Sequence, residues 1–357
     1  METVTKTLGI LTSGGDCPGL NAAIRGVCRA AYDKYNMTVM GIADGYRGLI
    51  DGDVELLKPK ALSGILTRGG TILGTSREKP FKSDDEENIS VDKIKENYRK
   101  YNLDCLVVIG GNGTNTTGYR LSQEGLNVIG LPKTIDNDIY GTDLTFGFHS
   151  ALSIGTEAID RLHSTAQSHN RIMVIELMGH KAGWLALYAG VAGGGDVILL
   201  PEIPYDIKAI GRHLLKRSKM GRDFSIVVVA EGALSVEEAA MEKKERKKFR
   251  EETVTTSIGY RVAKELEAET GMETRATVLG YVQRGGVPCA SDRVLATSLG
   301  VATADLLAKG EYGKMIAIVG NEIGAVDLSV PQGKVKGVPT DHYIIKTAEA
   351  VGTCMGR

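Results

Sequence analysis

The chain has 357 residues, of which 42% are hydrophobic and 24% charged, and its formal net charge at pH 7 is −1. This composition is that of a globular protein. The near-neutral charge excludes a general attraction to nucleic acid or anionic membranes, so any anion site must be local. The length exceeds what one compact core usually holds, which predicts two lobes.

The cysteines and the apolar runs indicate a cellular compartment. The five cysteines are odd in number and include no CxxC pair, which argues against a disulfide framework or a zinc site and favours a reducing environment. No apolar run approaches the roughly 20 residues that cross a bilayer. The apolar stretch near the N-terminus is too short and too broken by glycine for a signal peptide. We therefore expect a cytoplasmic protein with no nucleic-acid or membrane partner.

Short apolar runs alternate with helical patterns and meet at glycine-rich turns, which is typical of α/β proteins. The runs are β-branched and apolar throughout, as expected for parallel strands covered on both faces. The expected strands are residues 8–12, 37–43, 105–110, 127–131, 171–177, 196–201 and 224–230. The expected helices are residues 18–35, 146–166 and 184–194. The densely charged segment 236–252 is interpreted as a solvated helix, with a partner-binding patch as the alternative.

The first expected strand ends in a glycine-rich turn, Ser13-Gly14-Gly15-Asp16, followed by a helix that Pro18 would open. Glycine lets backbone N–H groups approach an anion, and a helix N-terminus adds partial positive charge. Proline suits a first helical turn because it has no N–H to leave unsatisfied. Alone, such a turn is as often structural as functional. It matches neither the P-loop nor the dinucleotide fingerprint.

A second glycine-rich turn, residues 110–114 (GGNGT), follows the strand at 105–110. Turns at the carboxyl ends of parallel strands face the same crevice in a doubly wound sheet. The two turns together therefore predict a polyphosphate site.

Acidic residues follow the strand at 127–131. Asp136 and Asp138 lie two residues apart, so one could accept a hydroxyl proton while the other holds Mg²⁺ directly or through water. The alternative is an Asx-rich turn without a catalytic role. Four arginines stand at turns and strand edges, and several converging guanidinium groups would hold a sugar phosphate. They are Arg77, Arg171, Arg275 and Arg284.

These motifs together resemble one family. TSGGDCPGLNAAIRG, GGNGT, PKTIDNDIYGTD, IELMGHKAGWLAL, VVAEGA and ETRATVLGYVQRGG follow the order of the phosphofructokinase family over about residues 7–320. The resemblance implies a glycolytic phosphotransferase that moves the γ-phosphoryl group of ATP to the 1-hydroxyl of D-fructose 6-phosphate, with Mg²⁺ as cofactor. Fructose 1,6-bisphosphate and ADP would be the products.

The resemblance also implies a fold and a domain organisation. We expect two doubly wound, mostly parallel α/β/α lobes with the active site in the cleft between them. Residues 1–145 would form the donor-binding lobe with the catalytic turn, and residues 146–310 the fructose 6-phosphate lobe. Residues 311–357 would pack back across both lobes.

Carried over residue by residue, the resemblance makes Asp136 the general base, with Thr134 and Lys133 beside it at the reaction centre. The donor would be held by Gly15, Arg77, Gly111, Asn112, Gly113 and Thr114. Mg²⁺ would be held by Asn112 and Asp138. Fructose 6-phosphate would be surrounded by Thr134, Ile135, Asp136, Met178, Gly179, His180, Glu231, Tyr281 and Arg284. Arg171 and Arg275 would reach the sugar phosphate from a neighbouring subunit, which implies a homo-oligomer, dimer or tetramer, with shared active sites.

Five positions depart from the common ATP-dependent pattern or bear on the choice of donor. Asn112 stands where an acidic, magnesium-linked residue is usual, His180 replaces an arginine and Tyr281 a histidine. Lys133 replaces a glycine and is typical of pyrophosphate-dependent members and of a mixed branch that includes ATP users. Gly113 favours ATP, because the aspartate usual there in pyrophosphate users would crowd and repel the α-phosphate. We therefore favour ATP as donor.

Three alternatives remain open. The nearest is a pyrophosphate-dependent phosphofructokinase with the same acceptor. A non-catalytic regulatory subunit that binds sugar phosphate is supported only by Asn112 and opposed by the intact Asp136 and Asp138. The lipid and NAD kinases share only the second glycine-rich turn, so they would leave PKTIDND and the arginines unexplained.

Overall fold

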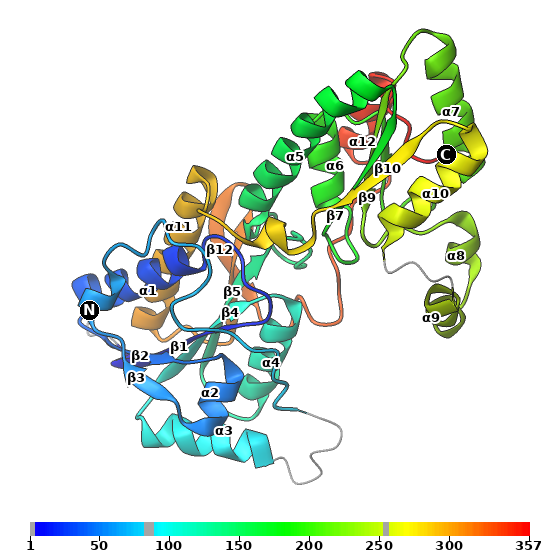
Figure 1. Ribbon diagram of the computed structural model, residues 1–357. Coiled ribbons are helices and arrows are strands. Elements are labelled where there is room, and N and C mark those ends of the chain that lie inside the picture. The colour runs from blue at the N-terminus through cyan, green and yellow to red at the C-terminus, as the bar shows by residue number, and fades with distance from the viewer. Residues whose placement is uncertain (1–3, 82–88, 253–256) are drawn as a thin grey trace. The chain divides into compact units, whose positions relative to one another are not determined.

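The computed structural model describes residues 4–81, 89–252 and 257–357, which fall into two compact units. Unit 1 consists of Met1–Ile135, Ile139–Ser150 and Arg284–Val335. Unit 2 consists of Asp136–Asp138, Ala151–Gln283 and Lys336–Arg357. Both are α/β with parallel sheets (Figure 1), as the sequence predicted. Within the described ranges, no helix is both long and apolar enough to cross a membrane.

Unit 1 is built on an eight-stranded sheet with the strand order β12-β11-β5-β4-β1-β2-β3, in which β6 also pairs with β5. The strands are β1 (Thr7–Ser13), β2 (Thr38–Ile42), β3 (Val54–Leu56), β4 (Cys105–Gly110), β5 (Val128–Thr134), β6 (Phe146–Gly147), β11 (Lys314–Val319) and β12 (Glu322–Asp327). The pairs β2–β3 and β11–β12 are antiparallel, and the other pairs are parallel. The unit's helices are α1 (Leu20–Tyr35), α2 (Tyr46–Asp51), η1 (Pro59–Leu62), α3 (Ile89–Lys100), α4 (Asn112–Gln123) and α11 (Ala290–Lys309), and the first residues of α5 (Phe148–His169) also belong to it.

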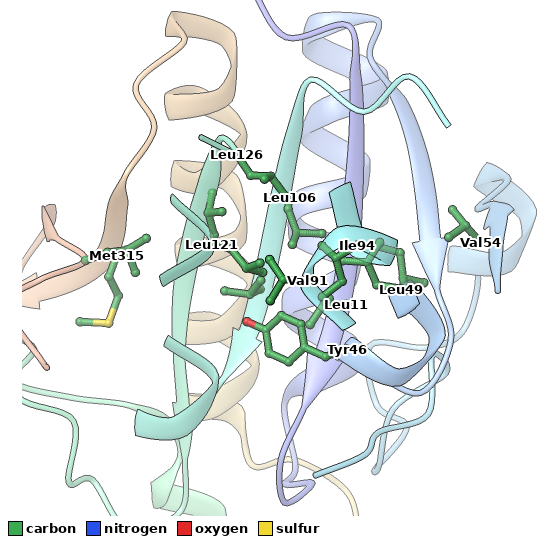
Figure 2. Packing of buried hydrophobic residues seen from close by; sticks show 14 of the residues in the cluster. Leu11, Tyr46, Leu49, Val54, Val91, Ile94, Leu106, Leu121, Leu126 and Met315 are labelled. Carbon is green, nitrogen blue, oxygen red and sulfur yellow. The ribbon is translucent and has the colours of Figure 1, made fainter. Parts of the chain in front are cut away.

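The sheet of unit 1 is covered on both faces, α2, α3 and α4 lying on one side and α1 and α11 on the other (Figure 1). Leu11 of β1 and Leu106 of β4 pack with Ile94 of α3 and Tyr46 of α2 (Figure 2). All four of these side chains are almost completely buried. The Tyr46 hydroxyl donates to the Thr114 carbonyl at 2.8 Å, so the core holds the first turn of α4 in place.

Unit 2 contains an all-parallel sheet of four strands, β10-β7-β9-β8. The strands are β7 (Ile172–Leu177), β8 (Val197–Leu199), β9 (Ser225–Ala230) and β10 (Thr274–Val278). Besides the rest of α5, the unit's helices are α6 (Trp184–Ala192), α7 (Ile207–Lys219), α8 (Val236–Ala240), α9 (Lys243–Glu252), α10 (Ile258–Thr270) and α12 (Tyr343–Ala350), while η2 (Gly280–Arg284) follows β10. Val174 of β7 and Val227 of β9 pack with Leu266 of α10 in its core.

Two of the boundaries that differ from the sequence prediction affect the candidate site. The helix expected from residue 18 begins at Leu20, because Gly19 has φ +109°, which a helical residue cannot adopt. Strand β5 runs on to Thr134, because Lys133 and Thr134 pair with β6. Lys133 and Thr134 are therefore strand residues, and the acidic turn starts after them.

The compact units also divide the chain differently from the three expected segments. Residues 284–310 were expected in the second lobe, but α11 packs against α1 in unit 1. The two helices approach closely at glycines: a Cβ on Gly26 would lie 2.7 Å from the Thr297 carbonyl oxygen, and one on Gly300 would lie 2.7 Å from that of Ala23. The last 22 residues, Lys336–Arg357, belong to unit 2.

The charged segment 236–252 forms two helices, α8 and α9, rather than one. Most of α9 is exposed as predicted, but Glu238 of α8 is fully buried and accepts hydrogen bonds from Arg250 and Arg261. Burial alone would raise the pKa of Glu238, yet the two guanidinium groups outweigh it and hold that pKa at about 2. This ion pair anchors α9 to α10, so the segment is only partly a solvated face.

Candidate active site

The first glycine-rich turn lies at the switch point of the unit 1 sheet. Strand β1 has β2 on one side and β4 on the other, and ligands of open α/β sheets bind beyond the carboxyl ends of such strands. Gly14 has φ +85°, and its N–H donates to the Ser76 carbonyl at 2.9 Å. The Thr75 hydroxyl donates to the Gly14 carbonyl at 2.6 Å. These two hydrogen bonds hold Thr75 and Ser76 against the glycine-rich turn. Arg77, the next residue, is exposed.

The second turn is the N-terminus of α4. The helix begins at Asn112 after the N-cap Gly111, so its first backbone N–H groups have no intrahelical acceptor and point where an anion would lie. The Thr114 hydroxyl donates to the Ser13 carbonyl at 3.2 Å, which ties the two turns together. Gly113 is exposed, and a Cβ there would have no heavy atom within 4 Å.

Two cations border the first turn. The Lys133 ammonium donates to the Gly15 carbonyl, and Lys133 is almost fully buried. Arg284 donates from Nη1 to the Asp16 carbonyl at 3.2 Å, and a Cβ on Gly15 would lie 2.7 Å from the same nitrogen. Burial raises the pKa of the neighbouring Cys17 thiol to about 12, so it stays neutral. The turn is therefore locally positive, as an anion site in a near-neutral protein must be.

The acidic residues Asp136–Asp138 are all less than a tenth exposed. Asn137 has φ +51°, in the left-handed region that asparagine tolerates. A lysine from the C-terminal segment meets this turn: the Lys336 N–H donates to the Asp138 carbonyl at 2.9 Å, and its ammonium donates to Asn137 Oδ1 at 3.0 Å. The turn is thus fixed by backbone and side-chain bonds from far along the chain.

In unit 2, the residues predicted to bind the sugar gather at the carboxyl ends of neighbouring strands. Glu231 follows β9, and its Oε1 accepts the N–H groups of Gly179 at 3.3 Å and His180 at 2.7 Å, both just after β7. The Met178 N–H donates to Gln283 Oε1 at 2.7 Å. Only glycine fits at 179, where φ is +146° and a Cβ would lie 2.6 Å from the Ala182 carbonyl oxygen.

Tyr281 lies in η2 after β10, also at a carboxyl end, and is 73% exposed.

Arg171 and Arg275 are not part of this group. Arg171 precedes β7 and Arg275 is the second residue of β10, so both lie at the amino ends of the strands. Both contact Glu273, Arg171 at 2.8 Å, and the hydrogen bond from Arg171 lowers the pKa of that carboxyl. Arg171 and Met178 flank the six residues of β7, so at roughly 3.3 Å per residue their backbones lie about 23 Å apart.

Across residues 4–81, 89–252 and 257–357, no group of three or more His, Cys, Asp and Glu residues could hold a metal ion.

A model of the phosphofructokinase family matches residues 7–307. The chain belongs to the phosphofructokinase family. A Spirochaeta thermophila protein named ATP-dependent 6-phosphofructokinase is 65% identical over 99% of this chain and 98% of its own length. A Streptomyces coelicolor protein named pyrophosphate–fructose 6-phosphate 1-phosphotransferase is 43% identical over 98% of this chain and 99% of its own.

Among solved structures, Pichia pastoris phosphofructokinase in the T-state matches with a TM-score of 0.80 and 33% identity. The match covers 97% of this chain and 36% of that longer chain.

Sequence reasoning missed residues that hold this family's motifs in place. Lys336 comes from a tail in which no motif was recognised, and it meets Asn137 across 199 positions of sequence. Gln283, next to Arg284, is fully buried, and its side-chain oxygen accepts the Met178 N–H. No periodicity or spacing marks such long-range polar contacts. The burial of Gln283, which requires a hydrogen-bond partner, is evident only in the structure.

Proposed function

We propose that this protein is an ATP-dependent 6-phosphofructokinase, which phosphorylates the 1-hydroxyl of D-fructose 6-phosphate and releases fructose 1,6-bisphosphate and ADP. The observation that carries the proposal is the bond from Thr114 to the Ser13 carbonyl. It ties the two glycine-rich turns together at a helix N-terminus, which supports one shared site for the phosphates of the donor. Relatives over the full length bear the same activity in their names.

The donor side is assigned to unit 1. Backbone N–H groups at Gly111–Thr114, the Gly15 turn and Arg77 would bind the phosphates of ATP. Lys133, held at the Gly15 carbonyl, would neutralise charge that develops on the transferred group. We assign Arg284 to fructose 6-phosphate; its guanidinium contacts the Asp16 carbonyl in the first glycine-rich turn.

The acceptor side is assigned to residues of unit 2, together with Thr134 and Ile135 at the end of unit 1's first segment. As the oxygen of the 1-hydroxyl bonds to the γ-phosphorus, Asp136 would take the proton of that hydroxyl. The bond between the γ-phosphorus and the β–γ bridging oxygen would break at the same time, and ADP would leave. Thr134 and Ile135 would position that hydroxyl. Glu231 Oε1 already accepts two backbone N–H groups, so its second oxygen is the one we assign to a sugar hydroxyl. Met178, Gly179, His180 and Tyr281 would complete the sugar site.

The oxygen donors present fit Mg²⁺ bound mainly by substrate. Asp138 offers a carboxylate and Asn112 an amide oxygen, and Mg²⁺ commonly takes one or two protein oxygens besides phosphates and water. When bound, the ion would neutralise charge on the β- and γ-phosphates. A cytoplasmic location agrees with the free cysteines.

A coupled assay with purified protein, fructose 6-phosphate and Mg²⁺ tests the donor. We expect turnover with ATP and at most weak turnover with pyrophosphate. Turnover with pyrophosphate alone would replace the proposal by the alternative that Lys133 and the Streptomyces coelicolor relative favour. No turnover with either donor, in protein that binds fructose 6-phosphate, would favour the regulatory-subunit alternative.

The placement of Arg171 and Arg275 supports shared active sites in a homo-oligomer. Both side chains lie at the opposite ends of the strands from the sugar-binding group. Arg171→Ala and Asp136→Asn should each be nearly inactive alone. When the two variants are mixed in equal amounts, dissociated and reassociated, the mixture should recover roughly a quarter of wild-type activity. About half of the subunit pairs would contain one copy of each variant, and each such pair would have one intact site out of two.

A matched control pairs Asp136→Asn with Glu231→Ala, since both residues are assigned to one subunit's own site. This mixture should stay inactive, because neither site of a mixed pair is intact. Equal recovery in both mixtures, or none in mixed oligomers verified by mass, would remove Arg171 from a neighbour's site.

A further inference from the structure

The segment from Lys336 to His342, which we call the C-terminal strap, contacts two functional parts of unit 2 at once. It follows unit 1's last segment and precedes α12, which packs beside α6 (Figure 1). One set of contacts reaches the acidic turn, and the other reaches the start of α6, directly at Trp184 and through Glu202 at the N-cap Gly183, where the loop between β7 and α6 ends. That loop carries Gly179 and His180 of the proposed sugar site.

Lys336 contacts the acidic turn through both its backbone and its side chain. Lys336 uses its backbone N–H for the Asp138 carbonyl and its ammonium for Asn137 Oδ1. Asn137 stands between the two carboxylates and has a positive φ. Because the Lys336 side chain holds Asn137, it also fixes the backbone conformation that orients Asp136 and Asp138.

The contacts at the start of α6, where the β7–α6 loop ends, come from the same residue and its neighbours. The Trp184 indole N–H donates to the Lys336 carbonyl at 2.8 Å, and the Lys336 ammonium lies 5.8 Å from the centre of that ring. Glu202 Oε1 accepts both the Gly183 N–H at 3.0 Å and the Val338 N–H at 2.8 Å. The His342 ring meets Trp184 edge-on at 5.2 Å.

We propose that Lys336 is a positioning residue for phosphoryl transfer: through the strap it holds the acidic turn in register with the sugar-binding loop. The proposal rests on the proposed function, since the acidic turn is assigned to the 1-hydroxyl and the loop to the sugar. A general base must stand within hydrogen-bond reach of the proton that it takes. A displacement of about 1 Å at such a site can cost about 10²-fold in rate.

The chain provides its own reporter of the strap. Trp184 is the only tryptophan, is 8% exposed and is bonded to Lys336 itself. Its fluorescence and its quenching by acrylamide therefore follow the seating of the strap without any substrate present. This measurement stays informative even if turnover fails with both donors, so it separates failure of this proposal from failure of the proposed function.

The test compares Lys336→Met, Lys336→Arg and the control Lys334→Met, since Lys334 is an exposed lysine two positions earlier that contacts Tyr140. Lys336→Met should lower kcat about 10- to 100-fold. Its KM for ATP should stay within about threefold, because the donor turns are untouched. Acrylamide quenching of Trp184 should rise. Lys336→Arg keeps a donor and should recover much of the kcat, while Lys334→Met should match wild type.

Wild-type kcat in Lys336→Met would overturn the proposal, whatever the quenching. A loss of kcat with Trp184 quenching unchanged would also overturn it, because the strap would then not be the route. If Lys336→Met fails to fold, the test uses Lys336→Arg instead. In that variant, both kcat and the acrylamide quenching constant should lie within about threefold of the wild-type values. A larger loss of kcat with wild-type quenching would count against positioning.

Discussion

Replacing Asp136 with asparagine is expected to lower kcat by at least about 10²-fold, the lower range for positioned proton transfer. The amide has nearly the shape of the carboxylate but cannot accept the proton of the 1-hydroxyl. Asp136 is almost fully buried, in a turn that Lys336 holds through Asn137 and Asp138. An isosteric change should therefore leave the turn in place and remove only the base. Steady-state kinetics with saturating ATP measure the effect.

The KM for fructose 6-phosphate should change little in this variant, because the assigned sugar contacts are made by other residues. Asp160→Asn, an exposed carboxylate of α5, is the matched control and should keep wild-type kcat. A near-normal kcat in Asp136→Asn would remove Asp136 from the mechanism. A large rise in KM at constant kcat would make it a binding residue instead.

The strands of this fold could be predicted because they are buried on both faces. Strand β4, residues 105–110, is apolar and β-branched along its whole length, and the predicted bounds are those observed. The start of α1 was misplaced because Gly19 adopts a left-handed conformation that residue type alone does not reveal. The assignment of α11 to unit 1 was missed because it depends on the close approach of Gly26 and Gly300 to the opposite helix.

The candidate site was predictable where it is made by contiguous motifs. The two glycine-rich turns end the adjacent strands β1 and β4, so a parallel sheet necessarily brings them to one edge. The acidic turn could be located, but its fixation by Lys336 could not, because a tail lysine has no pattern that distinguishes it from a solvated one. The expectation that Arg171 and Arg275 serve a neighbouring subunit came only from the resemblance, and their places at the amino ends of the strands could not be predicted from it.

Replacing Gly113 with aspartate is expected to lower kcat/KM for ATP by about 10²-fold, while any turnover with pyrophosphate changes by less than about threefold. Two like charges about 4 Å apart repel by up to about 4 kcal/mol near a protein surface, so a 10²-fold loss needs only part of that repulsion. Pyrophosphate has no α-phosphate for the new carboxylate to meet. The structure accommodates the side chain, since a Cβ at Gly113 meets no heavy atom within 4 Å.

The variant should also fold normally, which makes its kinetics interpretable. Position 113 is the second residue of α4, where a carboxylate interacts favourably with the helix dipole. Gly113→Asn supplies the control, because it adds the same bulk without charge and so separates crowding from repulsion. If asparagine costs as much as aspartate, crowding is the cause. If both donors lose equally in Gly113→Asp, position 113 does not distinguish the donors. Donor choice would then lie with Lys133, whose ammonium reaches the first glycine-rich turn from β5, on the far side of β4.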